Sequence, residues 1–197
     1  VQGVDFNDTR TAPRSQEAPW RNQDAVRMER TLDVARSKYV TAGGAVAEVY
    51  DYAVGDIDSG EWLNYTRTVP PGSYEVYLRQ ALINMEAGES VLEQVTSDPS
   101  QSNQTVKTLG SFLGTLTGFT FRNTPLTDGS GNKTVVRFNG VTTLRVRQVT
   151  ADTESKQRRQ NYLVLVPVAD AGTQRAAVTA LTPANNSVAD TVVPKVE

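Results

Sequence analysis

Three carboxylate residues, Asp56, Asp58 and Glu61, lie within one short segment of the sequence. Two carboxyl groups on either side of a bond are the arrangement that glycoside hydrolysis needs. These three residues instead crowd around Gly60, and Asp side chains commonly hydrogen-bond to nearby backbone groups in turns. The spacing therefore favours a solvated turn over a catalytic pair.

Two residue types that carry much of enzyme chemistry are missing, because the chain contains no Cys and no His. The sequence thus excludes a Ser-His-Asp triad, a His-ligated or thiolate-ligated zinc ion, a Cys nucleophile and a disulfide framework. The segment Asp128–Thr134 is only superficially similar to a phosphate-binding loop, since it lacks the first glycine at the required spacing and the strand-to-helix context. We therefore expect a protein that is not an enzyme.

The charge of the chain also restricts its partners. A formal net charge of −2 and a pI near 5.3 argue against a nucleic-acid partner, which usually requires a concentrated basic surface. The one notable basic cluster comprises Arg145, Arg147, Arg158 and Arg159. A solvated face explains it better than a polyanion site, unless the ligand is an acidic polysaccharide. No apolar run approaches the roughly 18 residues of a membrane span, so we expect none.

The elements that position these residues are predicted to be short strands. Residues 73–80 alternate with a period of two, with Tyr74, Val76 and Leu78 on one face, as expected for a strand with one buried side. Residues 61–69 alternate in the same way, and Pro70-Pro71-Gly72 follows them as a turn signal. These two strands are predicted to pair directly as a hairpin.

Further short runs rich in β-branched and aromatic residues continue this pattern to Val168. They predict strands at 26–31, 45–54, 90–96, 105–109, 119–123, 134–138, 142–148 and 162–168. Turn signals occur at 128–132 and 139–140, and the charged segment 151–160 is predicted to be an exposed connection. The predicted fold is all-β, an antiparallel jelly-roll-type sandwich.

The two ends differ from this body. Residues 9–24 are polar and irregular, which indicates a long surface loop. The sandwich is assigned to 1–170, and 171–197 to a linker or extended tail in which 187–197 could add one more strand. The first residues lack an initiator Met and a signal-peptide pattern, so we expect a mature, exported chain.

One stretch of the sequence resembles a known family. Gly60-Glu61-Trp62-Leu63-Asn64-Tyr65, followed by Val69-Pro70-Pro71-Gly72-Ser73-Tyr74-Glu75-Val76, is similar to the motif of family 6 carbohydrate-binding modules. Segments 142–146 and 161–165 resemble later strands of that family more loosely. The resemblance covers roughly residues 3–168 and implies a β-sandwich that binds a saccharide among loops at one end.

The resemblance also implies binding residues. A pyranose ring has an apolar face that stacks on an aromatic ring, and hydroxyls that need directional polar partners. Trp20 is a candidate platform, with packing under its loop or an assembly contact as the alternative, and Tyr39 is ambiguous between a sheet face and a cleft wall. Phe112 falls where many members of the family place a binding Trp, and Asn161 matches their polar ligand position. The motif residues Trp62 and Tyr65 are predicted to be core and hairpin determinants instead.

Members of this family also commonly bind a structural calcium ion. Asp5 and Asp8 could supply ligands, but Leu163 and Leu165 stand where a further carboxylate would help. Calcium prefers six to eight oxygen ligands. A calcium ion is therefore the one cofactor that the resemblance suggests, with Asp5 and Asp8 as its candidate ligands.

Two functions follow from the sequence. The first is a non-catalytic carbohydrate-binding module that binds an oligo- or polysaccharide, secreted or at a cell surface, with the absence of Cys favouring a bacterial origin. The alternative is a structural subunit of an extracellular filament or surface assembly, self-associating by strand addition through residues 184–197. A fold alone does not choose between them.

Overall fold

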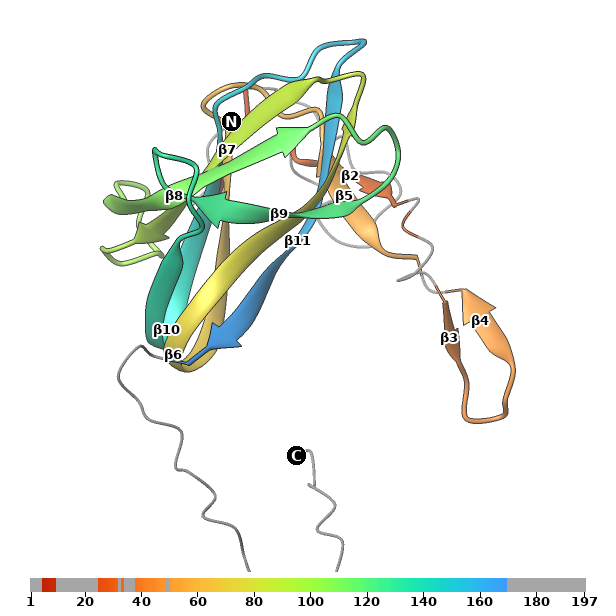
Figure 1. The fold of residues 1–197 in the computed structure, drawn as a ribbon, viewed down its shortest axis with the longest axis horizontal. Helices are drawn as coiled ribbons and strands as arrows, with labels where there is room; N and C mark the ends of the chain where they lie inside the picture. The colour runs from red at the N-terminus through yellow and green to blue at the C-terminus, as the bar shows by residue number, and fades with distance from the viewer. Residues whose placement is uncertain (1–4, 10–24, 32, 34–37, 49, 170–197) are drawn as a thin grey trace, which may run out of the picture.

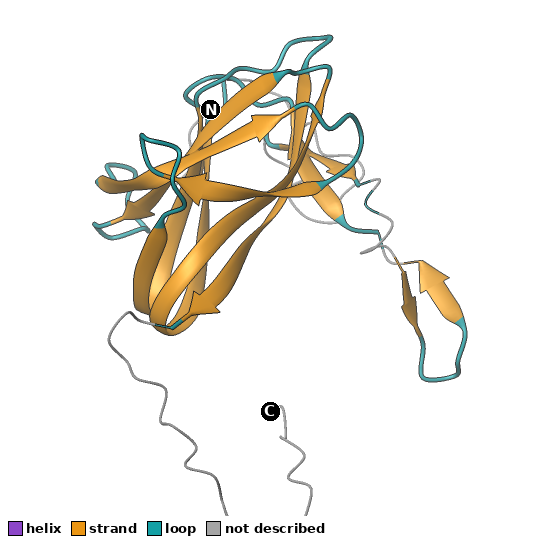
Figure 2. Cartoon of the chain, viewed as in Figure 1, coloured by secondary structure: helices purple, strands orange, loops and turns teal. Residues whose placement is uncertain are grey.

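The computed structural model describes residues 5–9, 25–31, 33, 38–48 and 50–169, and within these ranges the chain forms strands and loops without a helix (Figure 2). The all-β class is as the sequence predicts, and every strand pair is antiparallel. The strands are β1 (Phe6–Asn7), β2 (Arg27–Arg30), β3 (Lys38–Val40), β4 (Val46–Glu48), β5 (Tyr52–Gly55), β6 (Trp62–Ile83), β7 (Ala87–Val95), β8 (Val106–Thr115), β9 (Arg122–Thr127), β10 (Val135–Gln148) and β11 (Gln157–Val168).

Nine of these strands make one continuous sheet that folds into a sandwich (Figure 1). Its order is β10-β7-β8-β9-β6-β11-β5-β2, with β1 on β6 and a second pairing between β10 and β6. The first half of β6 lies in one layer with β1, the second half of β10 and β7. The second half of β6 lies in the other layer with β9, β11, β5 and β2. Strands β3 and β4 form a separate two-stranded sheet.

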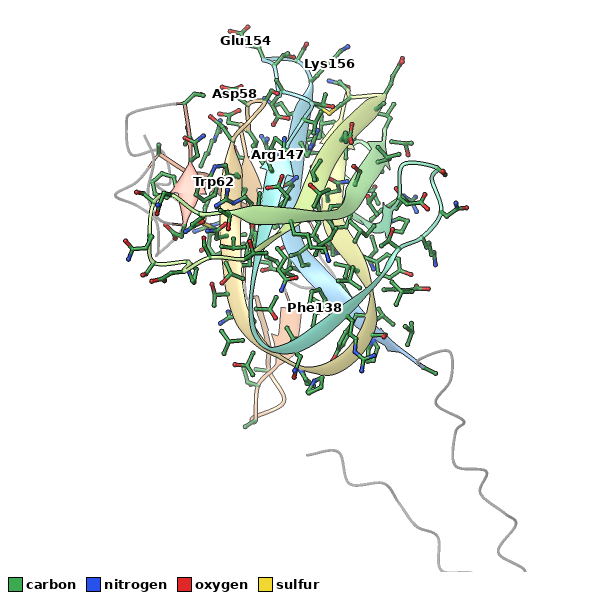
Figure 3. All side chains as sticks on the ribbon, turned by 90° about the vertical axis from the view of Figure 1, so that its left-hand side faces the viewer. Asp58, Trp62, Phe138, Arg147, Glu154 and Lys156 are labelled. Atoms are coloured by element: carbon green, nitrogen blue, oxygen red, sulfur yellow. The ribbon has the colours of Figure 1, made fainter. Side chains whose placement is uncertain are left out.

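The strand β6 joins the two layers by bending at Pro70 and Pro71. Figures 1 and 3 show β6 and β10 reversing direction together at one end of the sandwich. The predicted direct hairpin is wrong, because residues 62–69 pair with 140–147 of β10 and residues 73–83 pair with β11. The ladder between β6 and β10 shifts register at Phe138/Gly140, so the two prolines lie in a bulge. Proline has no backbone N–H to donate to a ladder, and a bulge is a position that tolerates this loss.

The core lies between the two layers. Its largest cluster takes side chains from five strands, and Tyr65, Leu163 and Leu165 pack against it while half-buried. Trp62 is buried, as predicted, with the Arg145 guanidinium 3.6 Å from the centre of its ring. The buried members of the cluster are Val69, Tyr74, Val76, Leu78, Leu92, Phe112, Leu126, Val136, Phe138, Leu144 and Val146.

The segment 151–160 departs from the prediction of an exposed connection. Strand β11 begins at Gln157, and Arg158 and Gln160 are buried among polar side chains at the end of the sandwich away from the β6 bend. The solvated-face interpretation of the basic cluster is therefore wrong for Arg158, which is 1% exposed, and also for the buried Arg145. A buried guanidinium needs several acceptors, and only the tertiary fold gathers them.

Both ends of the chain include residues that the structure does not describe. Strand β11 ends at Val168, and residues 10–24 and 170–197 lie outside the described residues. The predicted boundaries at 170 and 171 and the predicted N-terminal loop thus stay predictions. The part of the chain that the structure describes contains no helix long and apolar enough to cross a bilayer.

Candidate functional site

A hollow of about 90 Å³ lies on the outer face of the layer that contains β11. Its floor includes two small outward side chains, Ala53 of β5 and Ala81 of β6, from the two strands on either side of β11. Both are fully buried and pack with Phe121. Short side chains on a sheet surface leave room that larger ones on adjacent strands would fill. The complete lining is Glu29, Arg30, Thr31, Ala53, Ala81, Ile83, Phe119, Phe121 and Arg159.

Phe119 stands at the edge of this hollow on the connection between β8 and β9, which passes beside β5 and β11 (Figure 1). Its side chain is 62% exposed. Thr117 fixes the connection, because its hydroxyl accepts a hydrogen bond from the Leu82 amide at 2.9 Å and its own amide donates to the Leu82 carbonyl at 3.1 Å. Gly118 has a φ of 60° in the turn closed by the Thr120 amide and the Thr117 carbonyl, 3.2 Å apart. The aromatic ring is therefore held outward by a pinned turn.

The rim of the hollow carries fixed charges. Glu29 is held by two arginines, with Arg27 Nη2 2.5 Å from its Oε1 and Arg159 Nε on its Oε2. Arg159 also donates to the Arg158 carbonyl at 3.1 Å and to Gln157 Oε1 at 3.0 Å. Its guanidinium runs across Gly55, where an added Cβ would lie 2.6 Å from Nη1. The glycine thus leaves space for the arginine that forms one side of the site.

These features together suit an amphipathic, ring-shaped ligand. The exposed face of Phe119 offers a stacking surface, while Thr31 and the charged rim offer hydrogen-bonding groups at its border. Arg30 extends this border, and its guanidinium lies 4.2 Å from the centre of the Tyr50 ring. Both oxygens of Glu29 are engaged by cations, so this carboxylate is poorly placed to transfer a proton.

The crowded carboxylates of the sequence have structural roles. Glu61 is buried, and its two oxygens accept hydrogen bonds from the Thr9 amide at 2.6 Å and the Asp58 amide at 2.7 Å. Asp58 accepts the Thr9 hydroxyl at 2.9 Å, and Asp56 pairs with Arg27 at 2.6 Å. These contacts fit the predicted turn chemistry, but the prediction of a solvated turn is wrong for Glu61, which is buried and ties the turn to Thr9.

The structure distributes the predicted binding residues differently. Trp20 lies outside the described residues, as does the side chain of Tyr39, whose backbone is in β3. Phe112 is 0% exposed and belongs to the core between the layers. The assignment of Phe112 as a binding aromatic is therefore not supported by its position, because a ring without exposed surface cannot stack on a ligand. The pairing of β8 with β7 shifts register next to Gly110. The sequence of β8 therefore did not indicate which of its faces would be buried.

Asn161 lies away from the Phe119 hollow. The pairing of β11 with β6 shifts register between Gln160 and Tyr162, and this bulge separates Asn161 from the outward face of Arg159. Its side chain lines a second cleft, between the two layers, and its Nδ2 lies 3.3 Å from Asp51 Oδ2. A bulge changes the face that a side chain occupies, which period-two reasoning does not detect.

Phe119 was missed by the sequence interpretation because it was placed at the start of a strand. The strand β9 begins three residues later, at Arg122. The signal that was present is Thr117-Gly118 directly before Phe119, since a glycine with positive φ is typical of a tight turn. A large aromatic that follows such a turn belongs to a loop tip.

The predicted calcium ligands are not gathered into a metal site. Asp5 is exposed and Asp8 is buried, and within the described ranges no three acidic, His or Cys side chains come together. Calcium needs six to eight oxygens, so the side chains that the structure places here do not by themselves fit the ion. Binding of calcium through Asp5 and Asp8 stays a prediction.

Three comparisons with known proteins were made. No family model matches the sequence, and no curated protein matches it. Solved structures do match its fold at low sequence identity. Among them is a family 6 carbohydrate-binding module of Clostridium stercorarium in complex with cellobiose, with a TM-score of 0.43 and 18% identity, covering 66% of this chain and 81% of that chain.

Two further matches have the same character. A carbohydrate-binding module from Cellvibrio mixtus lichenase 5A, in complex with cellotriose, has a TM-score of 0.46 and 18% identity over 73% of this chain and 88% of that chain. A family 36 module in complex with calcium and xylotriose has a TM-score of 0.40 and 13% identity over 72% and 93%. The solved structures similar in fold thus include modules of the family that the sequence resembles.

Proposed function

We propose that this chain is a non-catalytic carbohydrate-binding module that acts outside the cell, and that it binds a saccharide against Phe119. The observation that carries the proposal is the outward-held ring of Phe119 beside a hollow with a small-residue floor and a polar rim. A sugar ring placed there would stack its C–H face on the aromatic face and turn its hydroxyls toward Thr31, Arg30 and Arg159.

The absence of catalysis is part of this proposal. Glycoside hydrolysis needs two carboxyl groups facing one bond, at separations of roughly 5 to 9.5 Å. Glu29 is the one carboxylate among the described residues that line the hollow, and both of its oxygens are held by arginines. Asp56 and Glu61 are each engaged in structural contacts. These commitments support binding rather than bond cleavage.

The test is a glycan-binding screen followed by calorimetric titration of the best soluble oligosaccharide. Phe119→Ala is expected to weaken binding about tenfold or more, and Phe119→Trp to preserve it, because both effects follow the size of the stacking face. Leu116→Ala is the matched control, since Leu116 is 53% exposed on the same connection but does not line the hollow. Equal affinities for Phe119→Ala and Leu116→Ala would remove Phe119 from the site. A lack of binding across the whole screen would contradict the function itself.

A second candidate function is a structural subunit that associates by strand addition through residues 184–197. The observation that favours it is the edge of β11 that faces away from β6. This edge pairs with β5 at Gln160 only, and over 161–168 no described strand pairs with it. An unpaired edge is a template for another strand. Deleting residues 184–197 and measuring particle size tests this candidate, and an unchanged monomer before and after deletion would refute it.

A further inference from the structure

Among the described residues, no strand joins the two layers along one side of the sandwich, and an apolar cleft of about 220 Å³ lies there. One wall is the inner face of the first half of β6 and of β10, and the other is the inner face of β11. Three of its lining side chains, Tyr65, Leu163 and Leu165, pack on the core yet stay half-buried. The lining is completed by Arg67, Val69, Thr142, Leu144, Asn161 and Tyr162.

The cleft is open because the strands on either side have few neighbours there. Beyond β10, the first half of β6 pairs only with the two residues of β1, which face Trp62 and Leu63. Strand β11 pairs with β5 at Gln160 alone. Within the described residues, no strand closes the gap between positions 65–69 of β6 and 161–168 of β11. Core side chains thus remain accessible between two separated sheet edges.

The polar groups of the cleft differ at its two ends. Arg67 lies toward the bend of β6, next to Val69, and Asn161 lies toward the opposite end, since β11 approaches the bend only at Val168. The Arg67 side chain is exposed and has no ion pair or hydrogen bond with any described residue. An uncommitted guanidinium beside an apolar cleft favours a planar anion such as a carboxylate.

We propose that this cleft binds a small amphipathic carboxylate, with its apolar body against Tyr65, Leu163 and Leu165 and its carboxylate on Arg67. The volume lies below the roughly 300 to 1,000 Å³ of drug-sized sites, which restricts the ligand to about ten non-hydrogen atoms. The site is separate from the Phe119 hollow and shares no lining residue with it. The proposal therefore stands or falls independently of saccharide binding.

Titration of the full chain with sodium octanoate, compared with uncharged 1-octanol, tests this site. We expect octanoate to bind with a dissociation constant on the order of 0.5 mM, typical of a ligand of this size. Arg67→Gln is expected to weaken octanoate binding about tenfold and to leave octanol binding unchanged, because it removes the charge but not the apolar walls. Arg137→Gln, at an exposed position of β10 outside the cleft, is the matched control and should change neither.

Amide chemical shifts provide a measurement that needs no variant. Octanoate should shift the amides of residues 65–69, 142–144 and 161–165 in the wild-type chain, while a saccharide should shift those around Phe119. The proposal is overturned if octanoate shifts no amide in the cleft, if octanol binds as tightly as octanoate, or if Arg67→Gln and Arg137→Gln behave alike. Shifts of the same amides on dilution without ligand would also overturn it, because a second copy of the chain would then occupy the cleft.

Discussion

Replacing Arg158 with Met should destabilise the sandwich far more than its place in a charged segment suggests. Arg158 is 1% exposed, and its guanidinium donates through Nη1 to the Glu89 carbonyl at 3.1 Å, to Ser90 Oγ at 2.6 Å and to Gln148 Oε1. Through Nη2 it donates to the Thr150 carbonyl at 3.2 Å. Burial lowers the pKa of Arg158 and raises that of its neighbour Asp152, since each loses hydration. The side chain therefore links β7, β10 and the connection to β11.

The magnitude of the loss follows from the acceptors that would remain. The Glu89 carbonyl still accepts the amides of Val149 and Thr150 at 3.1 and 3.2 Å, and Gln148 Oε1 still accepts the Ser90 hydroxyl at 2.8 Å. The carbonyl of the half-buried Thr150 loses the arginine, which costs up to about 1–3 kcal/mol where water does not replace the donor. The loss of the Arg158 charge adds to this, because that charge attracts the buried Asp152 carboxylate and partly offsets the rise of its pKa by burial. We expect about 3 kcal/mol in total at neutral pH, because Met restores part of the packing.

Urea unfolding followed by tryptophan fluorescence at pH 7 measures this loss. A change of about 3 kcal/mol should also lower the melting temperature by roughly 6–12 °C for a domain of this size. Lys156→Met is the control. Lys156 is exposed at the tip of the β10–β11 connection, near Glu154 (Figure 3), and its replacement should change the free energy of unfolding by less than about 0.5 kcal/mol. Adding Asp152→Asn to Arg158→Met should recover about 1 kcal/mol, because the residual buried charge is then removed.

Two results would contradict a stabilising role for Arg158. If Arg158→Met lowered the free energy of unfolding by less than about 1 kcal/mol, the value would fall within the ordinary range of surface substitutions and small packing changes. The polar network at this end of the sandwich would then not be a determinant of stability. The same conclusion would follow if Arg158→Met and Lys156→Met were indistinguishable.

Three further predictions follow from the buried groups. Burial raises the folded-state pKa of Asp152 above its ordinary value of 3.8, so protonation of this carboxyl favours the folded state. The wild type should therefore lose stability relative to Asp152→Asn as the pH rises from 3.8 through the raised pKa. Urea midpoints between pH 3 and 7 would measure this loss. Gly88→Ala would place a Cβ 2.7 Å from Arg158 Nη2 and 2.8 Å from Met85 Sδ, and should lower the free energy of unfolding by about 1–3 kcal/mol. Gly129→Ala, with open space around it, should lower it by less than about 0.5 kcal/mol in the same assay. Glu61→Gln loses one of the two oxygens that accept backbone amides and should cost about 1–3 kcal/mol, and an unchanged melting temperature would contradict the role of Glu61 in fixing the turn.

Parts of the fold could be predicted because local patterns carry them. The alternation in 73–80 places Tyr74, Val76 and Leu78 on a buried face, and all three are in the core. The composition around Gly60 predicts a turn, and Gly60 has a φ of 86°. These features depend on residues close in sequence, so the sequence pattern contains most of the information that determines them.

The candidate site was predicted less well, because long-range pairing decides it. Local sequence predicts a hairpin around Pro70 and Pro71, but residues 62–69 pair with β10 and residues 73–83 pair with β11. Phe112 and Phe119 are both aromatic residues near glycines, and only the layering of the sheet buries the first and exposes the second. The bulge beside Asn161 moved that residue into a cleft between the layers.

Local sequence patterns thus predict the all-β class, the period-two strands and the turn at Gly60, and the composition excludes His and Cys chemistry. Long-range pairing places Phe119 beside a hollow and buries Arg158. It also leaves no strand, among the described residues, between positions 65–69 of β6 and 161–168 of β11. The physical reason is the range of the interactions involved. Side-chain alternation is fixed by the backbone of one strand, whereas exposure depends on which strand, bulge or loop from a distant part of the chain lies opposite.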